Sequence, residues 1–181
     1  MACWSFLRVL AAGLVLTLGG AAGMAQTGTA PAPFPSQVFK SWALDCLVPK
    51  TGSNAGTRVC FIHHEARAPA DPKLIAARAV IRHAGAERKL MLIVELPPNT
   101  VQASGATVAI DGGSPEPISI AGCISQFCYG ALELTPALQS ALKVGHEMAV
   151  GFTPKDHPSF TVPVPLAGVT AALAALEQTG S

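Results

Sequence analysis

Short runs in which hydrophobic and polar residues alternate recur along most of the chain. The strongest run is Lys89–Leu96, and Pro97-Pro98-Asn99 ends it. Ile118–Ala121 and Gly130–Leu134 flank a short turn that has a cysteine at either end. A period of two is typical of half-buried β-strands, and proline interrupts a strand because it has no N–H group to donate. The pattern therefore predicts a fold made mainly of short strands.

There are six other strand candidates, and we expect about eight short strands in the fold. The six candidates are Val38–Cys46, Arg58–Glu65, Leu74–Arg82, Thr107–Ile110, Glu147–Thr153 and Phe160–Pro165. The alanines of Leu74–Arg82 also permit a helix, but the arginines lie on one face and the isoleucines on the other, as in a half-buried strand. With no internal repeat and little helix, the pattern indicates an all-β sandwich or barrel.

Two segments have helical features. Thr135 and Pro136 are typical of the N-cap and first position of a helix, which we expect near 136–142, and Gly145 lies beyond its end. The C-terminal segment Leu166–Glu177 is rich in alanine and leucine and has an apolar stripe at helical spacing. Such a short helix is not stable alone in water. We therefore expect it to dock on the sandwich rather than on a partner.

The N-terminus has the features of a signal peptide. A single arginine precedes the apolar run Val9–Leu18, and small residues follow, which favours cleavage between Ala25 and Gln26. A retained membrane anchor is the alternative, but the apolar run is short for a membrane span. We therefore predict a signal peptide over 1–25 and no membrane span after its removal.

The composition beyond the leader is that of one exported globular domain. Segment 26–37 is rich in Pro, Thr and Ala, which predicts a flexible linker before a β-sandwich domain over 38–178. Of 12 basic and 11 acidic residues, the leader removes only Arg8, so the mature chain is neutral. A neutral chain lacks the general electrostatic attraction that nucleic-acid binding requires, so we expect no nucleic-acid partner.

The cysteines agree with export. Of the five, Cys3 leaves with the leader and the mature chain keeps Cys46, Cys60, Cys123 and Cys128. Four cysteines in an exported chain indicate two disulfides, with three possible pairings. Loop entropy alone would favour a crossed pairing, but the turn-like spacing favours the neighbours, Cys46 with Cys60 and Cys123 with Cys128.

The order of several short motifs resembles the invasion-associated locus B family, over roughly Trp42 to Leu176. The motifs are Trp42-x3-Cys46, Cys60, Asp111-Gly112, Cys123 with Phe127-Cys128, Leu142-x2-Gly145, Phe152 and Val164-Pro165-Leu166-x-Gly168. The resemblance implies an exported protein of Gram-negative bacteria with an immunoglobulin-like β-sandwich. The family is named for a role in entry into host cells. It has no established enzymatic activity, so the resemblance implies none for this chain.

A few residues outside these motifs are candidates for chemistry. His63 and Glu65 share one face of a strand and could bind a metal, but a site needs three or four ligands, so solvated polar groups are the simpler interpretation. Arg78 and Arg82 suggest either a basic patch or, as we expect, a solvated strand face. Asp111 begins a tight turn rather than a calcium loop, because no series of ligands follows it. No residue group indicates catalysis, a bound metal or a cofactor.

The sequence therefore predicts a periplasmic or secreted β-sandwich protein, stabilised by two disulfides, with a binding or envelope/host-interaction role and no enzymatic activity. Its partner, an unknown protein or envelope component, is not readable from the residues. The alternative is a small periplasmic enzyme or a metal-binding carrier that uses His63, Glu65 or other histidines.

Overall fold

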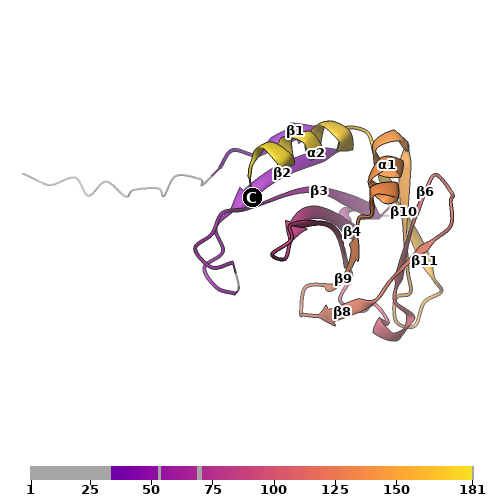
Figure 1. Ribbon diagram of the computed structural model, residues 1–181. Coiled ribbons are helices and arrows are strands. Elements are labelled where there is room, and N and C mark those ends of the chain that lie inside the picture. Colours follow the sequence, from indigo (N-terminus) through magenta and orange to yellow (C-terminus); the bar gives the residue numbers. More distant parts are fainter. Residues whose placement is uncertain (1–33, 53, 69–70, 181) are drawn as a thin grey trace, which may run out of the picture. The chain divides into compact units, whose positions relative to one another are not determined.

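The computed structural model describes residues 34–180 apart from 53 and 69–70. The predicted signal peptide and most of the predicted linker lie outside the described residues. Within them, eleven β-strands form two antiparallel sheets, with two α-helices and one short 3-10 turn, η1 (Gln102–Ser104). The predicted all-β, sandwich-like fold with two short helices is confirmed, although the strands outnumber the eight or so expected (Figure 1).

The larger sheet has seven strands in the order β1-β2-β3-β4-β5-β9-β8. They are β1 (Gln37–Phe39), β2 (Trp42–Leu47), β3 (Val59–Ala68), β4 (Asp71–Ala84), β5 (Lys89–Leu96), β8 (Ile120–Cys123) and β9 (Cys128–Glu133). The first five strands are neighbours both in sequence and in the sheet, because hairpins join each to the next. The segment whose alanines also permit a helix is the strand β4, and the strongest run, β5, is an interior strand.

The smaller sheet has four strands in the order β11-β10-β6-β7. They are β6 (Ala106–Ile110), β7 (Glu116–Ile118), β10 (Glu147–Phe152) and β11 (Phe160–Pro165). The edge strand β11 contains Pro163 and Pro165, which cannot donate backbone hydrogen bonds and so discourage pairing with another chain. β11 also contacts β3 and β4, which brings the two sheets together.

α2 (Val169–Gln178) covers part of one face of the larger sheet, and α1 (Pro136–Val144) packs against α2. α1 begins where the Thr135 hydroxyl accepts a hydrogen bond from Leu138 N–H at 3.3 Å. α2 contacts β1, β2, β3 and α1, and lies across β1 and β2 in Figure 1. The predicted apolar stripe, Leu166, Val169, Leu173 and Leu176, is buried in the common core. The expected docking of this helix on its own chain is therefore observed.

The predicted strand Ile118–Ala121 requires a correction. The chain crosses here from β7 of the smaller sheet to β8 of the larger one, with the corner at Ser119. The corner passes directly over Gly130, where an added Cβ would lie 2.6 Å from both an Ile118 methyl carbon and the Ser119 carbonyl oxygen. Only glycine in β9 leaves room for this close approach.

The first predicted strand, Val38–Cys46, is likewise divided in two. Lys40 turns the chain between β1 and β2 with φ at 54°. Gly168, at the start of α2, lies against this turn with φ at 94°, and a Cβ there would overlap the Phe39 carbonyl. Ser41 N–H donates to the Ala167 carbonyl oxygen at 3.2 Å. These contacts fix the N-terminus of α2 against the edge of the larger sheet.

Candidate functional site

Both disulfides lie within the larger sheet and join neighbouring strands. Cys46 of β2 is bonded to Cys60 of β3, and Cys123 of β8 to Cys128 of β9, with Cα–Cα distances of 4.0 and 3.9 Å. Each pair also faces directly across its antiparallel ladder. These are the neighbour pairs expected from the spacing. Since each bond joins register partners, both fix the alignment of a hairpin.

His63 and Glu65 lie in β3, and each is already engaged with another side chain. His63 Nε2 lies 2.7 Å from Asp45 Oδ2, and Arg67 Nη2 donates to Glu65 Oε2 at 3.3 Å. In the described part of the chain, no three His, Cys, Asp or Glu side chains are arranged to hold a metal ion. The geometry therefore assigns this pair to hydrogen bonds within the sheet.

Asp45 is the acidic partner of His63 and has a perturbed pKa. Burial alone would raise the pKa of Asp45, but hydrogen bonds from Ser36 and His63 and the positive charges of His63 and Arg78 hold it below its ordinary value of 3.8. The carboxylate is thus stabilised in its charged form beside the histidine. Its role is to fix His63 on β3.

Asp111 has a structural role at the turn after β6. Its carboxylate accepts hydrogen bonds from the backbone N–H groups of Glu147, at 2.9 Å, and His146, at 3.0 Å. These two backbone bonds hold the pKa of Asp111 below its ordinary value of 3.8. The Asp111 turn therefore connects β6 to the start of β10, which agrees with a turn rather than a calcium loop.

One face of the larger sheet is left uncovered by the smaller sheet and the helices. Alternate residues of β3, β4 and β5, such as Ile62, Ile81 and Leu92, point into the core, so their neighbours in sequence point away from it. We call this second surface the open face. Its central side chains are Phe61, Arg78, Val80, Arg82, Ile93, Glu95 and Tyr129.

Strand register brings the residues of the open face together. Arg78 of β4 faces Glu95 of β5, and Glu95 in turn faces Tyr129 of β9. Val80 and Ile93 form the next cross-strand pair, and Val80 is only 6% exposed. The apolar pair Val80 and Ile93 thus lies next to the polar residues Arg78, Glu95 and Tyr129.

The open face is hollowed into a trough of about 480 Å³. Leu47, the last residue of β2, and Asn54, from the loop between β2 and β3, line one side. Phe127, from the turn between β8 and β9, lines the other and meets the Tyr129 ring edge-to-face, with centroids 6.3 Å apart. Tyr129 is 38% exposed, so an aromatic surface is available to a ligand in the trough.

Arg78 is fixed at the centre of this trough. Its Nη1 donates to Glu95 Oε2 at 3.1 Å, and its guanidinium carbon lies 5.6 Å from the centre of the Phe61 ring. Its Nε is buried without a hydrogen-bond partner. Arg82, two residues further along β4, is half-buried and forms no ion pair with any described residue. Arg78 is therefore held by contacts within the sheet, while Arg82, on the same strand face, has no ion-pair partner among the described residues.

A second hollow lies at another part of the domain. It has a volume of about 610 Å³ and a largely apolar lining that includes Leu74, Pro97, Phe152 and Phe160. His157 is the one titratable side chain among its described lining residues. The mainly apolar lining offers few groups to orient a ligand, so the trough on the open face is the better candidate site.

Sequence reasoning missed the aromatic and acidic members of the trough. Phe61, Glu95 and Tyr129 come from three different strands, and no feature within any one strand indicates that they meet. The alternation in each strand does place Arg78, Val80 and Arg82 on one face, which was the available signal. The strands that pair with β4 and its neighbours decide which other side chains lie beside Arg78, Val80 and Arg82. The alternation within β4 does not contain that information.

Comparisons with known proteins agree with this architecture. The model of a family described as Invasion associated locus B (IalB) protein matches residues 42–177. The chain is also similar to a solved structure, the crystal structure of invasion associated protein b from Bartonella henselae. Their TM-score is 0.68 at 16% sequence identity, over 81% of this chain and 97% of that chain, so the similarity concerns the fold. A search of curated proteins found no match.

Proposed function

The chain belongs to the invasion associated locus B family, and we propose that it is an exported, disulfide-stabilised binding protein of a Gram-negative bacterium. In this proposal the open face of the larger sheet is the binding surface, and the partner is a protein or another component of the envelope or of a host cell. The observation that carries the proposal is the trough of about 480 Å³ on that face, where aromatic, apolar and charged side chains converge.

The composition of the trough supports binding rather than chemistry. Glu95 and Arg78 neutralise each other at 3.1 Å, and the other central side chains include Phe61, Ile93 and Tyr129. Arginine and tyrosine are enriched where proteins bind one another because each combines a large contact area with hydrogen-bonding groups. An ion pair between apolar neighbours orients a ligand without supplying a nucleophile.

Two features support export to the periplasm or beyond. The predicted signal peptide over 1–25 would direct the chain across the inner membrane. Both disulfides then require an oxidising compartment. No helix among the described residues is long and apolar enough to cross a membrane.

Export is tested by N-terminal sequencing of the protein from periplasmic and culture fractions. We expect the mature chain to begin at Gln26 or within a few residues of it. Recovery of intact Met1 in the membrane fraction would contradict the proposal, because the chain would then retain its leader as an anchor.

The binding surface is tested with purified mature protein and isolated envelope fractions or host-cell membranes. We expect Tyr129→Ala to weaken binding by about tenfold, the equivalent of roughly 1.4 kcal/mol of lost contact. Val144→Ala is the matched control, because Val144 is 77% exposed on α1, away from the open face. Equal binding by both variants would show that the open face is not the binding surface.

A further inference from the structure

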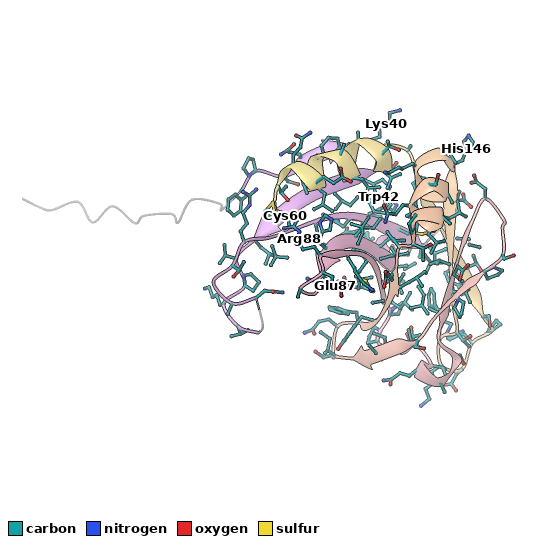
Figure 2. The ribbon with its side chains drawn as sticks, viewed as in Figure 1. Lys40, Trp42, Cys60, Glu87, Arg88 and His146 are labelled. Carbon is teal, nitrogen blue, oxygen red and sulfur yellow. A yellow bond between two sulfur atoms is a disulfide. The ribbon has the colours of Figure 1, made fainter. Side chains whose placement is uncertain are left out.

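A third hollow, lined by basic residues, adjoins the trough. It has a volume of about 510 Å³ and is lined by three arginines, Arg58, Arg82 and Arg88. Asn54, Val59 and Arg82 line both hollows, so the two lie side by side. Figure 2 labels Arg88 on the turn between β4 and β5, near Cys60, which lines the same hollow.

The protein holds two of these arginines in place before any ligand arrives. The Arg58 guanidinium carbon lies 4.4 Å from the centre of the Phe34 ring, and its Nη2 lies 3.4 Å from the sulfur of Cys46. Arg88 Nη1 donates to the Gly180 carbonyl oxygen at 2.7 Å. The Arg58 contacts use only part of a guanidinium group that has five N–H donors, so further donors of Arg58 remain for a ligand.

The charges in the two hollows are strongly unbalanced. Among their described lining residues, Glu95 is the only acidic one, and it is paired with Arg78. Neither Arg58 nor Arg82 forms an ion pair with any described residue. In a mature chain whose basic and acidic residues balance, this local concentration of positive charge favours an anionic ligand.

We propose that the trough and the basic hollow form one binding site for an anionic glycan. Its sulfate or phosphate groups bind Arg58 and Arg82, and its sugar rings lie against Phe61 and Tyr129. Guanidinium groups match tetrahedral oxyanions with paired N–H donors, and aromatic rings offer an apolar face to the C–H groups of a sugar. This inference rests on the proposed function, because it names the ligand class of the same surface.

The ion pair in the middle of the trough favours a glycan over a lipid chain. An acyl chain in the trough would cover Arg78 and Glu95 and remove them from water without replacing their hydrogen bonds, which is costly. Sugar hydroxyl groups both donate and accept, so they can bond to the guanidinium and the carboxylate together. A glycan can therefore form hydrogen bonds with Arg78 and Glu95 and also pack against the rings of Phe61 and Tyr129.

The test is calorimetric titration of the full mature protein, with its disulfides formed, against a sulfated heparin oligosaccharide. A neutral dextran oligosaccharide and phosphatidylglycerol vesicles serve as comparison ligands. We expect the sulfated glycan to bind at least about tenfold more tightly than dextran, and its affinity to fall with added salt because charges are screened. Binding of the vesicles but not of the glycan would overturn the inference.

Two arginine variants locate the site. Arg82→Gln and Arg58→Gln each remove one charge, and we expect each to weaken glycan binding by about tenfold. Lys40→Gln is the control, since it also removes one positive charge. Lys40 lies at the turn between β1 and β2, and Figure 2 shows it well away from Arg88. Arg58 is exposed, so its variant keeps the test valid if Arg82→Gln does not fold. Equal affinities for all three variants would overturn the inference.

The two proposals fail in different ways. If glycan binding is absent but Tyr129→Ala still weakens attachment to envelopes or host membranes, the open face is a binding surface for another ligand class. If Tyr129→Ala also has no effect, the proposed function itself is refuted.

Discussion

Replacement of Leu173 by alanine tests whether α2 is an integral part of the domain. Leu173 is 2% exposed and lies in the buried stripe of α2, which packs on β1, β2 and β3. The change removes about three buried carbon groups at roughly 0.8 kcal/mol each, and the space they leave adds a cavity cost. We expect the free energy of unfolding to fall by about 3 kcal/mol.

This loss arises from packing and not from helix propensity. Alanine is the best helix former, so Leu173→Ala does not weaken the helix itself. Glu177→Ala is the matched control, because it places the same residue at an exposed position of the same helix. We expect its effect to stay within about 0.5 kcal/mol.

The measurement is urea denaturation with both disulfides intact, supported by thermal unfolding. For a domain of this size, about 3 kcal/mol corresponds to a fall in melting temperature of roughly 6–12 °C. An unchanged denaturation midpoint for Leu173→Ala would refute the reasoning, because α2 would then contribute nothing to the folded core. If the variant also bound its partner more weakly, α2 would be assigned to an interface.

Three further predictions concern the turns and the second disulfide. Because backbone hydrogen bonds hold the pKa of Asp111 below 3.8, its contribution to stability is present above that pH and is lost as the pH falls through the lowered value. Asp111→Asn should therefore reduce the dependence of the denaturation midpoint on pH in this acid range, and an unchanged dependence would contradict this role. Gly130→Ala should destabilise the domain by about 1–3 kcal/mol in urea denaturation, since the new methyl group overlaps the corner between β7 and β8; a wild-type midpoint would show that the corner moves freely. Replacement of Cys123 and Cys128 together by serine should cost about 2 kcal/mol, as expected for so short a loop, and non-reducing peptide mapping of the wild type should recover these two cysteines in one linked peptide. A crossed pair in that map would contradict the observed register.

Local sequence features predicted most of the strands and both helices. Lys89–Leu96 is the strand β5 with the predicted bounds, and the helix near 136–142 extends only slightly further, to Val144. Alternation identified these elements because each strand has one face in the core. The capping residue Thr135 identified the start of α1 because its hydroxyl satisfies a backbone N–H group at the helix end.

Contacts between distant segments explain the two divided strands. The corner at Ser119 depends on Gly130, eleven residues away, and the turn at Lys40 lies against Gly168 near the C-terminus. The hydrophobic pattern continues through both breaks. A local pattern therefore predicts that a segment is extended, while packing elsewhere decides which sheet it joins.

The sequence by itself determined the class of fold, the faces of individual strands such as Arg78 and Val80 on β4, and the resemblance to the family. These features depend on residue types and on spacing within one element. The tertiary structure alone decided the composition of the candidate site. Pairing of β3, β4, β5 and β9 sets Phe61, Arg78, Glu95 and Tyr129 around one trough, and the turn after β4 adds Arg88 beside it. Strand register is a property of two segments together, because it is set by the hydrogen bonds and side-chain packing between them, so no single segment contains it.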